Sequence, residues 1–167
     1  IGVAVAAESG LLWIANHATN SVSVVDLETG QETDRIAVSR EPFAITITPD
    51  ESLAIVTNLL PRGRATNPRH AAEISLIDVP TRSQIATIQL PAGSSSVRDA
   101  LTSADGRWAY ITHTVGRTNL PTTQVARGWI NTNGLSLIDL QRRELVATVL
   151  LDHPLEGAAD PWGLASD

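Results

Sequence analysis

One pattern occurs three times in this sequence and constrains its fold more than any other feature. An apolar residue, a serine, two apolar residues, an aspartate and a further apolar residue follow one another at residues 22–27, 74–79 and 135–140. A β-rich stretch precedes each copy, another follows it, and a further one opens each unit. β-Branched residues dominate these stretches, and helical periodicity is poor.

Four short strands per unit, recurring at roughly 40–50 residues, are typical of the blades of a β-propeller. We therefore predict an all-β chain with three four-stranded antiparallel blades, plus the first strand of a fourth. Stretches such as Leu12-Trp13-Ile14 are apolar on both faces, which suits a sheet packed between two neighbouring sheets. The predicted blades span about 2–38, 43–90 and 98–151, and the start of the fourth blade spans about 162–167.

The units lengthen along the chain while their strands keep their length. Equivalent positions at the first strand of each unit are Gly2, Ala44, Asp99 and Gly163. The extra residues fall in loops at about 59–72 and 114–133. In a propeller these loops emerge on the same face as the links between blades, so we predict a loop-built rim there.

The repeated aspartate ends its strand directly before a turn, in all three units. A short carboxylate at such a place accepts hydrogen bonds from backbone N–H groups of the turn. We therefore interpret Asp26, Asp78 and Asp139 as structural residues and not as a catalytic carboxylate cluster.

Composition excludes several classes of function. The formal net charge is −6, which argues against broad binding to nucleic acids or anionic membranes. The absence of cysteine excludes disulfides, thiolate metal sites and a haem-attachment motif in this segment. No apolar run approaches the ~20 residues that span a bilayer, so membrane insertion is not expected. The start at Ile1, inside a strand pattern, suggests a processed or truncated chain.

The repeat resembles a known family. Trp13 to Asn16 and Ile55 to Asn58 correspond to its "YVTN" strand, and Val22 to Asp26 and Ile74 to Asp78 correspond to its "VSVID" strand. The chain thus resembles the YVTN-type β-propeller repeat family. The resemblance implies an extracytoplasmic bacterial or archaeal protein, at the cell surface or in the periplasm. The departures Arg98-Asp99 and His113, with the third insert, resemble propellers associated with c-type cytochromes and redox proteins.

Candidate binding residues gather on the predicted rim and at the entry to the innermost strands. A rim with cationic, aromatic and histidine groups on an acidic protein is a reasonable site for an anionic ligand or a partner protein. The candidates are Arg62, Arg64, His70, Arg98, Asp99, His113, Arg117, Arg127, Trp129, Asp160 and Trp162. The alternative is that Arg98, Trp129 and Trp162 anchor long loops and bind nothing.

Catalytic and cofactor signatures are missing. There is no GxSxG elbow, no phosphate-binding GxxxxGK and no HExxH motif, so catalysis by this segment alone is not expected. His17, His70 and His113 lie in three units without ligand-like spacing, which disfavours a metal site. We therefore expect no cofactor in this segment, or else a haem that a neighbouring module supplies.

We interpret the chain as a non-catalytic binding scaffold that presents its rim to a protein or polysaccharide. The alternative is the propeller of a periplasmic redox protein that docks a cytochrome or positions a haem- or quinone-type cofactor. A lactonase-like propeller would need carboxylates and histidines around a channel metal, which the sequence does not show. Because closed propellers use ~4–8 blades, we also expect further blades of the same longer chain as partners.

Overall fold

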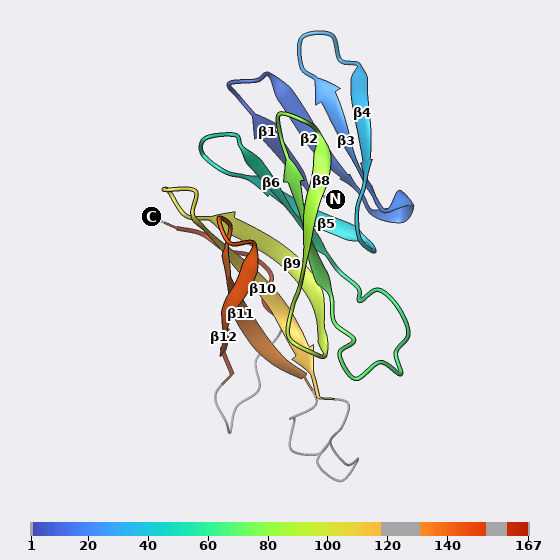
Figure 1. Cartoon of the computed structure of the whole chain (residues 1–167), viewed down its shortest axis with the longest axis vertical. Helices are drawn as coiled ribbons and strands as arrows, with labels where there is room; N and C mark the ends of the chain where they lie inside the picture. The colour runs from blue at the N-terminus through green and yellow to red at the C-terminus, as the bar shows by residue number, and fades with distance from the viewer. Residues whose placement is uncertain (1, 118–130, 153–159, 167) are drawn as a thin grey trace.

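The protein forms three four-stranded antiparallel sheets, which confirms the predicted all-β propeller segment (Figure 1). The computed structural model describes residues 2–117, 131–152 and 160–166. The first sheet contains β1 (Val3–Ala6), β2 (Leu11–Asn16), β3 (Ser21–Asp26) and β4 (Glu32–Ala37). The second contains β5 (Pro42–Ile47), β6 (Leu53–Asn58), β7 (Glu73–Asp78) and β8 (Ser83–Gln89). The third contains β9 (Ser94–Thr102), β10 (Trp108–Gly116), β11 (Asn131–Asp139) and β12 (Glu144–Leu150).

Each sheet is a blade in which strands pair in chain order, and a short 3₁₀ turn, η1 (His17–Thr19), joins β2 to β3. The repeated aspartates bind the turns that end the third strands. Backbone N–H groups of Thr29, Thr81 and Arg142 donate to the carboxylates of Asp26, Asp78 and Asp139, at 2.7, 2.8 and 2.9 Å. Hydrogen bonds from these turn residues are the main cause that holds the pKa of each carboxyl below its usual range. The structural interpretation of the aspartates is confirmed.

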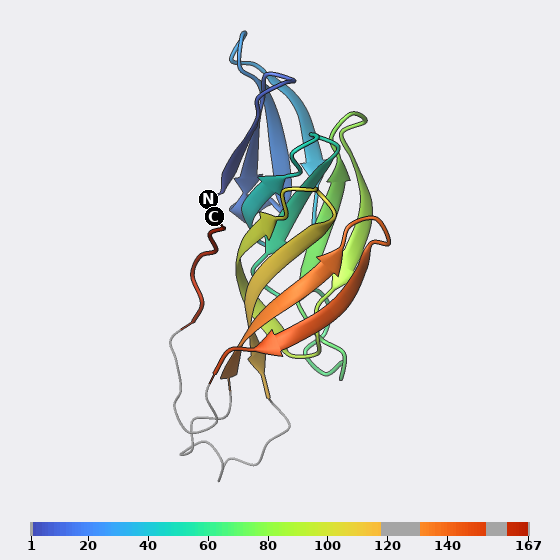
Figure 2. The same cartoon turned by 90° about the vertical axis from the view of Figure 1, so that its left-hand side faces the viewer.

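The core lies between blades and not within one of them, which explains why the strands are apolar on both faces. Between the first two blades, Trp13 and Val24 of one sheet pack against Val56 and Ile77 of the next. Between the second and third blades, a separate cluster includes Ile55, Leu76, Ile111 and Ile138 among its fully buried members. Figure 2 shows the three sheets stacked in chain order.

The serine of the repeat is buried and hydrogen-bonds to the residue that ends the second strand. In the first blade Asn16 Nδ2 donates to Ser23 Oγ at 2.6 Å, and in the second Asn58 Nδ2 donates to Ser75 Oγ at 3.2 Å. Buried polar groups need such partners. The Asn–Ser pair therefore explains why the repeat keeps a hydroxyl between apolar residues.

Two elements differ from expectation. β9 begins at Ser94, before the predicted start at residue 98, because Ser94 and Ser95 pair with the end of β10. Residues 160–166 form no strand, so the predicted first strand of a fourth blade is not seen in the described residues. A strand needs a backbone partner, whereas the N–H of Leu164 donates to the side chain of Asp99. The described residues include no helix long and apolar enough to cross a membrane.

Candidate functional site

Two neighbouring innermost strands each carry an irregularity near the start of the strand. In β5, residues 43 and 44 lie opposite Thr57 alone, and in β9 residues 96–98 lie opposite His113 alone. A residue with positive φ lies near each irregularity: Glu41, at 58°, comes two residues before Phe43, and Ser96, at 52°, is the first unpaired residue in β9. β-Bulges of this kind bend a strand and change the direction in which a side chain points. They place Phe43 and Arg98 at equivalent positions of their blades, directly before Ala44 and Asp99.

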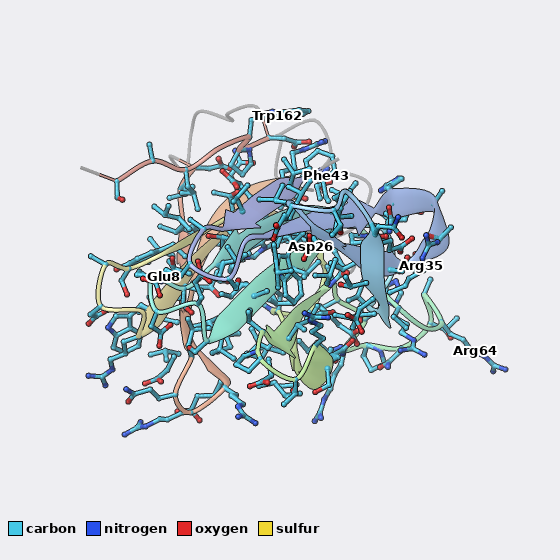
Figure 3. The ribbon with its side chains drawn as sticks, turned by 90° about the horizontal axis from the view of Figure 1, so that it is seen from above. Glu8, Asp26, Arg35, Phe43, Arg64 and Trp162 are labelled. Atoms are coloured by element: carbon cyan, nitrogen blue, oxygen red, sulfur yellow. The ribbon has the colours of Figure 1, made fainter. Side chains whose placement is uncertain are left out.

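Phe43 and Arg98 both contact Trp162. Trp162 directly precedes Gly163, the residue that is equivalent to Ala44 and Asp99 in the repeat. The Arg98 guanidinium carbon lies 4.3 Å from the centre of the Trp162 ring. Phe43 packs edge-to-face on the same indole, with ring centres 6.4 Å apart and planes at 88°. Figure 3 shows Trp162 and Phe43 next to each other, and Figure 2 shows the last described residues running past the innermost strands. We call these three residues the channel-mouth cluster.

The acidic residues beside the cluster hold the segment in place. Asp99 Oδ2 accepts the N–H of Leu164 at 2.8 Å, and Asp99 Oδ1 accepts the N–H of Ala100 at 2.9 Å. Asp160 lies 3.8 Å from Arg98 Nη2, which is longer than a hydrogen bond. Asp99 thus anchors the chain, while Asp160 makes a loose ion pair.

A pocket of about 630 Å³ opens beside Phe43, between the ends of the first two blades. Its walls are Ile14, Ala15, Asn16, His17, Ala18, Thr19, Arg35, Phe43 and Leu59. Arg35 and His17 in this lining both have acidic neighbours: Arg35 donates to Glu32 at 2.8 Å, and His17 Nε2 lies 3.7 Å from Glu41. The surface that this pocket offers to a ligand is therefore mainly apolar.

The predicted rim residues Arg62 and Arg64 are exposed in the β6–β7 loop, and Figure 3 shows Arg64 projecting away from the ribbon. A groove of about 400 Å³ lies between this loop and the link from β4 to β5. Arg40 and Arg62 both line the groove. Arg40 Nε lies 3.8 Å from Glu41, which is outside the lining, and the lining itself contains no acidic side chain. We call this feature the arginine groove.

His70 and Arg117 lie elsewhere on the rim, in the wall of a second pocket of about 680 Å³. Backbone hydrogen bonds join three segments there: Gly93 N–H donates to His70 O at 2.8 Å, and Gly116 N–H donates to Gly93 O at 2.8 Å. A side chain on Gly93 would meet the Gly116 oxygen at 2.1 Å, so only glycine permits this approach. The insert of the second blade is thus pinned at this junction.

The placement of His113 on the rim is wrong, because its ring is fully buried inside the third blade. Its Nε2 lies 2.7 Å from Ser136 Oγ, and Ser136 Oγ lies 2.7 Å from Thr148 Oγ1. Burial lowers the pKa of His113 below its usual value. Since Asn16 and Asn58 occupy the same position in the other blades, this Ser–His pair is structural and not a nucleophile with its base.

Arg127 and Trp129, also predicted for the rim, lie outside the described residues. His17, His70 and His113 belong to three different blades. Residues 2–117, 131–152 and 160–166 contain no group of three or more His, Asp or Glu that could hold a metal ion.

Sequence reasoning missed Phe43 as a site residue. The signal was present, because Glu41-Pro42-Phe43 and Asp160-Pro161-Trp162 are both an acidic residue, a proline and an aromatic residue before a small residue. Phe43 was interpreted only as part of a strand. The contact of Phe43 with Trp162 places this position of the repeat in the channel-mouth cluster.

Comparisons with known proteins support the fold and give one sequence relative. No family model matches the chain. A 74-residue stretch is 30% identical to hydrazine synthase subunit beta of Kuenenia stuttgartiensis. That stretch is 44% of this chain and only 19% of the relative's length.

Three solved structures resemble the chain as a whole. The match to hydrazine synthase of Kuenenia stuttgartiensis covers 97% of this chain and 57% of the hydrazine synthase chain, with a TM-score of 0.52 at 21% sequence identity. The match to dihydro-heme d1 dehydrogenase NirN in complex with DHE covers 92% of this chain and 26% of the NirN chain, with a TM-score of 0.63 at 18% sequence identity. The match to U3-55K covers 88% of this chain and 38% of the U3-55K chain, with a TM-score of 0.62 at 12% sequence identity. At these identities the similarity shows the fold alone: the chain is a segment of β-propeller.

Proposed function

We propose that this chain is part of the propeller of a redox-associated, extracytoplasmic protein of the YVTN-repeat type. In this proposal it is a non-catalytic scaffold, and its rim docks a partner protein that carries the haem, such as a cytochrome. The observation that supports the proposal most is the 30% identity over 74 residues with a subunit of hydrazine synthase. The word subunit in that name describes a protein that works in an assembly, which is the situation a docking rim serves.

The arginine groove is the part of the rim best suited to docking. Arg62 and Arg64 are exposed, and Arg40 lines the same groove as Arg62 on a chain with a net charge of −6. A local cationic groove on an acidic protein attracts the acidic surface of a partner and repels a basic surface, so it orients the partner as it approaches. We therefore propose that the partner presents acidic side chains to this groove.

The test uses two purified soluble c-type cytochromes, one with an acidic and one with a basic docking surface. Binding is measured by titration calorimetry at low and at physiological ionic strength. We expect the acidic cytochrome to bind, and its affinity to fall with added salt as exposed charge pairs are screened. The double substitution Arg62→Glu and Arg64→Glu should abolish binding, whereas Arg142→Glu, in the β11–β12 turn on the opposite face, should not change it.

Failure of both cytochromes to bind at low ionic strength would refute cytochrome docking. Equal loss of affinity in the Arg142→Glu control would show that net charge, and not the groove, governs the association. Binding of the basic cytochrome in preference to the acidic one would contradict the proposed role of the groove.

A further inference from the structure

We infer that the channel-mouth cluster of Phe43, Arg98 and Trp162 binds a planar aromatic ligand that carries a carboxylate. Phe43 lies on β5, Arg98 on β9 and Trp162 in the segment 160–166, whereas the arginine groove lies between the β6–β7 loop and the β4–β5 link. The inference therefore concerns a second site, and it goes beyond protein docking.

The cation of this site has unused hydrogen-bonding capacity. A guanidinium carries five N–H donors in a planar fork. Arg98 donates no hydrogen bond to any other described residue, and its Nε is buried without a partner. Its side chain is 22% exposed, and the nearest carboxylate, Asp160, stands 3.8 Å away and is 50% exposed. The buried Nε is out of a ligand's reach, so a ligand carboxylate would accept N–H bonds from the two terminal nitrogens, Nη1 and Nη2.

The aromatic part of the site is open to a ligand. Trp162 is 67% exposed even though Arg98 stacks on its ring and Phe43 meets its edge. Phe43 also forms part of the wall of the 630 Å³ pocket, together with Ile14 and Leu59. An aromatic ring system gains from offset or edge contacts with such residues in addition to burying apolar area.

The combination selects the ligand class. An aliphatic anion would use Arg98 but leave the aromatic surface in water. A neutral aromatic molecule would cover the guanidinium without satisfying its donors, which is costly for a charged group. A planar molecule with a carboxylate satisfies both parts at once.

The repeat explains how the site is assembled. Phe43 and Arg98 lie in the bulges of two successive blades, directly before the equivalent positions Ala44 and Asp99, and Trp162 directly precedes the next equivalent position, Gly163. Asp99 fixes that segment through the Leu164 N–H, so that Trp162 stays over Arg98. The second blade, the third blade and the last described segment thus each contribute one side chain to the cluster.

The experiment uses 1-pyrenebutyrate, which is planar, fluorescent and carries a carboxylate, and 1-pyrenebutanol, which differs only in lacking the charge. Binding is followed by fluorescence anisotropy. We expect pyrenebutyrate to bind and Arg98→Gln to weaken it by at least about tenfold, because a hydrogen bond to a charged group is lost. Pyrenebutanol should bind to the wild type more weakly than pyrenebutyrate does, and Arg98→Gln should leave pyrenebutanol affinity unchanged or raise it, because the neutral ligand no longer covers a charged group.

Two further variants keep the test decisive. Trp162→Leu replaces an exposed side chain, so the fold should persist while pyrenebutyrate affinity falls. Arg107→Gln is the matched control, since Arg107 stacks on Trp108 at 4.6 Å in the same blade but outside the channel-mouth cluster. Unchanged affinity in both Arg98→Gln and Trp162→Leu would overturn the inference, as would absence of pyrenebutyrate binding. Because these readouts involve no cytochrome, they succeed or fail independently of the docking proposal.

Discussion

The third blade holds a histidine where the other two hold an asparagine, and we predict that Gly134 is what makes this exchange possible. Gly134 pairs with His113 across β11 and β10. A Cβ on Gly134 would lie 3.1 Å from His113 Cε1 and 3.3 Å from Nε2. In the first blade the residue opposite Asn16 is Ser21, and in the second blade Asn58 Nδ2 donates to Glu73 O at 2.8 Å.

The perturbation is Gly134→Ala. Its backbone has no positive φ, so alanine is compatible with the strand, and the change gains about 0.4–1 kcal/mol by restricting the unfolded chain. Forcing a methyl group into a packed core costs about 1–3 kcal/mol. We therefore expect a net loss of about 1.3 kcal/mol in the free energy of unfolding from the middle of both ranges, and of about 2.6 kcal/mol at most. The contacts at 3.1 and 3.3 Å decide the sign, because the buried ring must move a few tenths of an ångström.

A double-mutant cycle tests the reasoning by urea unfolding followed by circular dichroism. In a His113→Asn background, which restores the residue of the other blades, Gly134→Ala should cost nothing or should stabilise the protein. The expected coupling energy between the two sites is about 1–2 kcal/mol. If the two single effects add within about 0.5 kcal/mol, the steric explanation of Gly134 is wrong.

Three further predictions concern buried groups. The unfolded chain protonates His113 near its usual pKa of 6.5, but burial lowers the pKa in the folded chain. The free energy of unfolding should therefore fall as the pH falls below 6.5. Between about pH 7.5 and about pH 5.5, the midpoint temperature of thermal unfolding should drop less in His113→Asn than in the wild type. Ser75→Ala leaves the Asn58 amide without its hydroxyl partner and should cost about 1–3 kcal/mol in urea unfolding. Gly93→Ala should destabilise the protein more than Gly63→Ala, because both have positive φ but only Gly93 faces a neighbouring carbonyl.

Each of these has a result that would contradict it. The same pH dependence in wild type and His113→Asn would show that another group controls acid stability. A cost below about 0.5 kcal/mol for Ser75→Ala would mean that water replaces the hydroxyl. Equal destabilisation by the two glycine substitutions would show that backbone strain, and not the close approach, limits the junction.

Much of the fold follows from sequence because its signals are local. The apolar-Ser-apolar-apolar-Asp pattern marks the third strand of every blade, and the Asp places the turn that follows. Strands that are apolar on both faces indicate sheets covered on both sides, and the structure has such sheets. These properties depend on residues close in the chain, so periodicity alone reveals them.

The candidate site depends on contacts that sequence spacing does not encode. The two bulges turn Phe43 and Arg98 toward Trp162, which is far away in the chain, and only the register between strands reveals them. Likewise His113 ends a strand in the sequence like any rim residue, but the pairing with Gly134 directs its ring into the blade. The sequence by itself determined the blades and their order, through a local repeat. Tertiary packing alone decided which side chains reach the channel mouth and which are buried, because both outcomes depend on strand register and on neighbours distant in the chain.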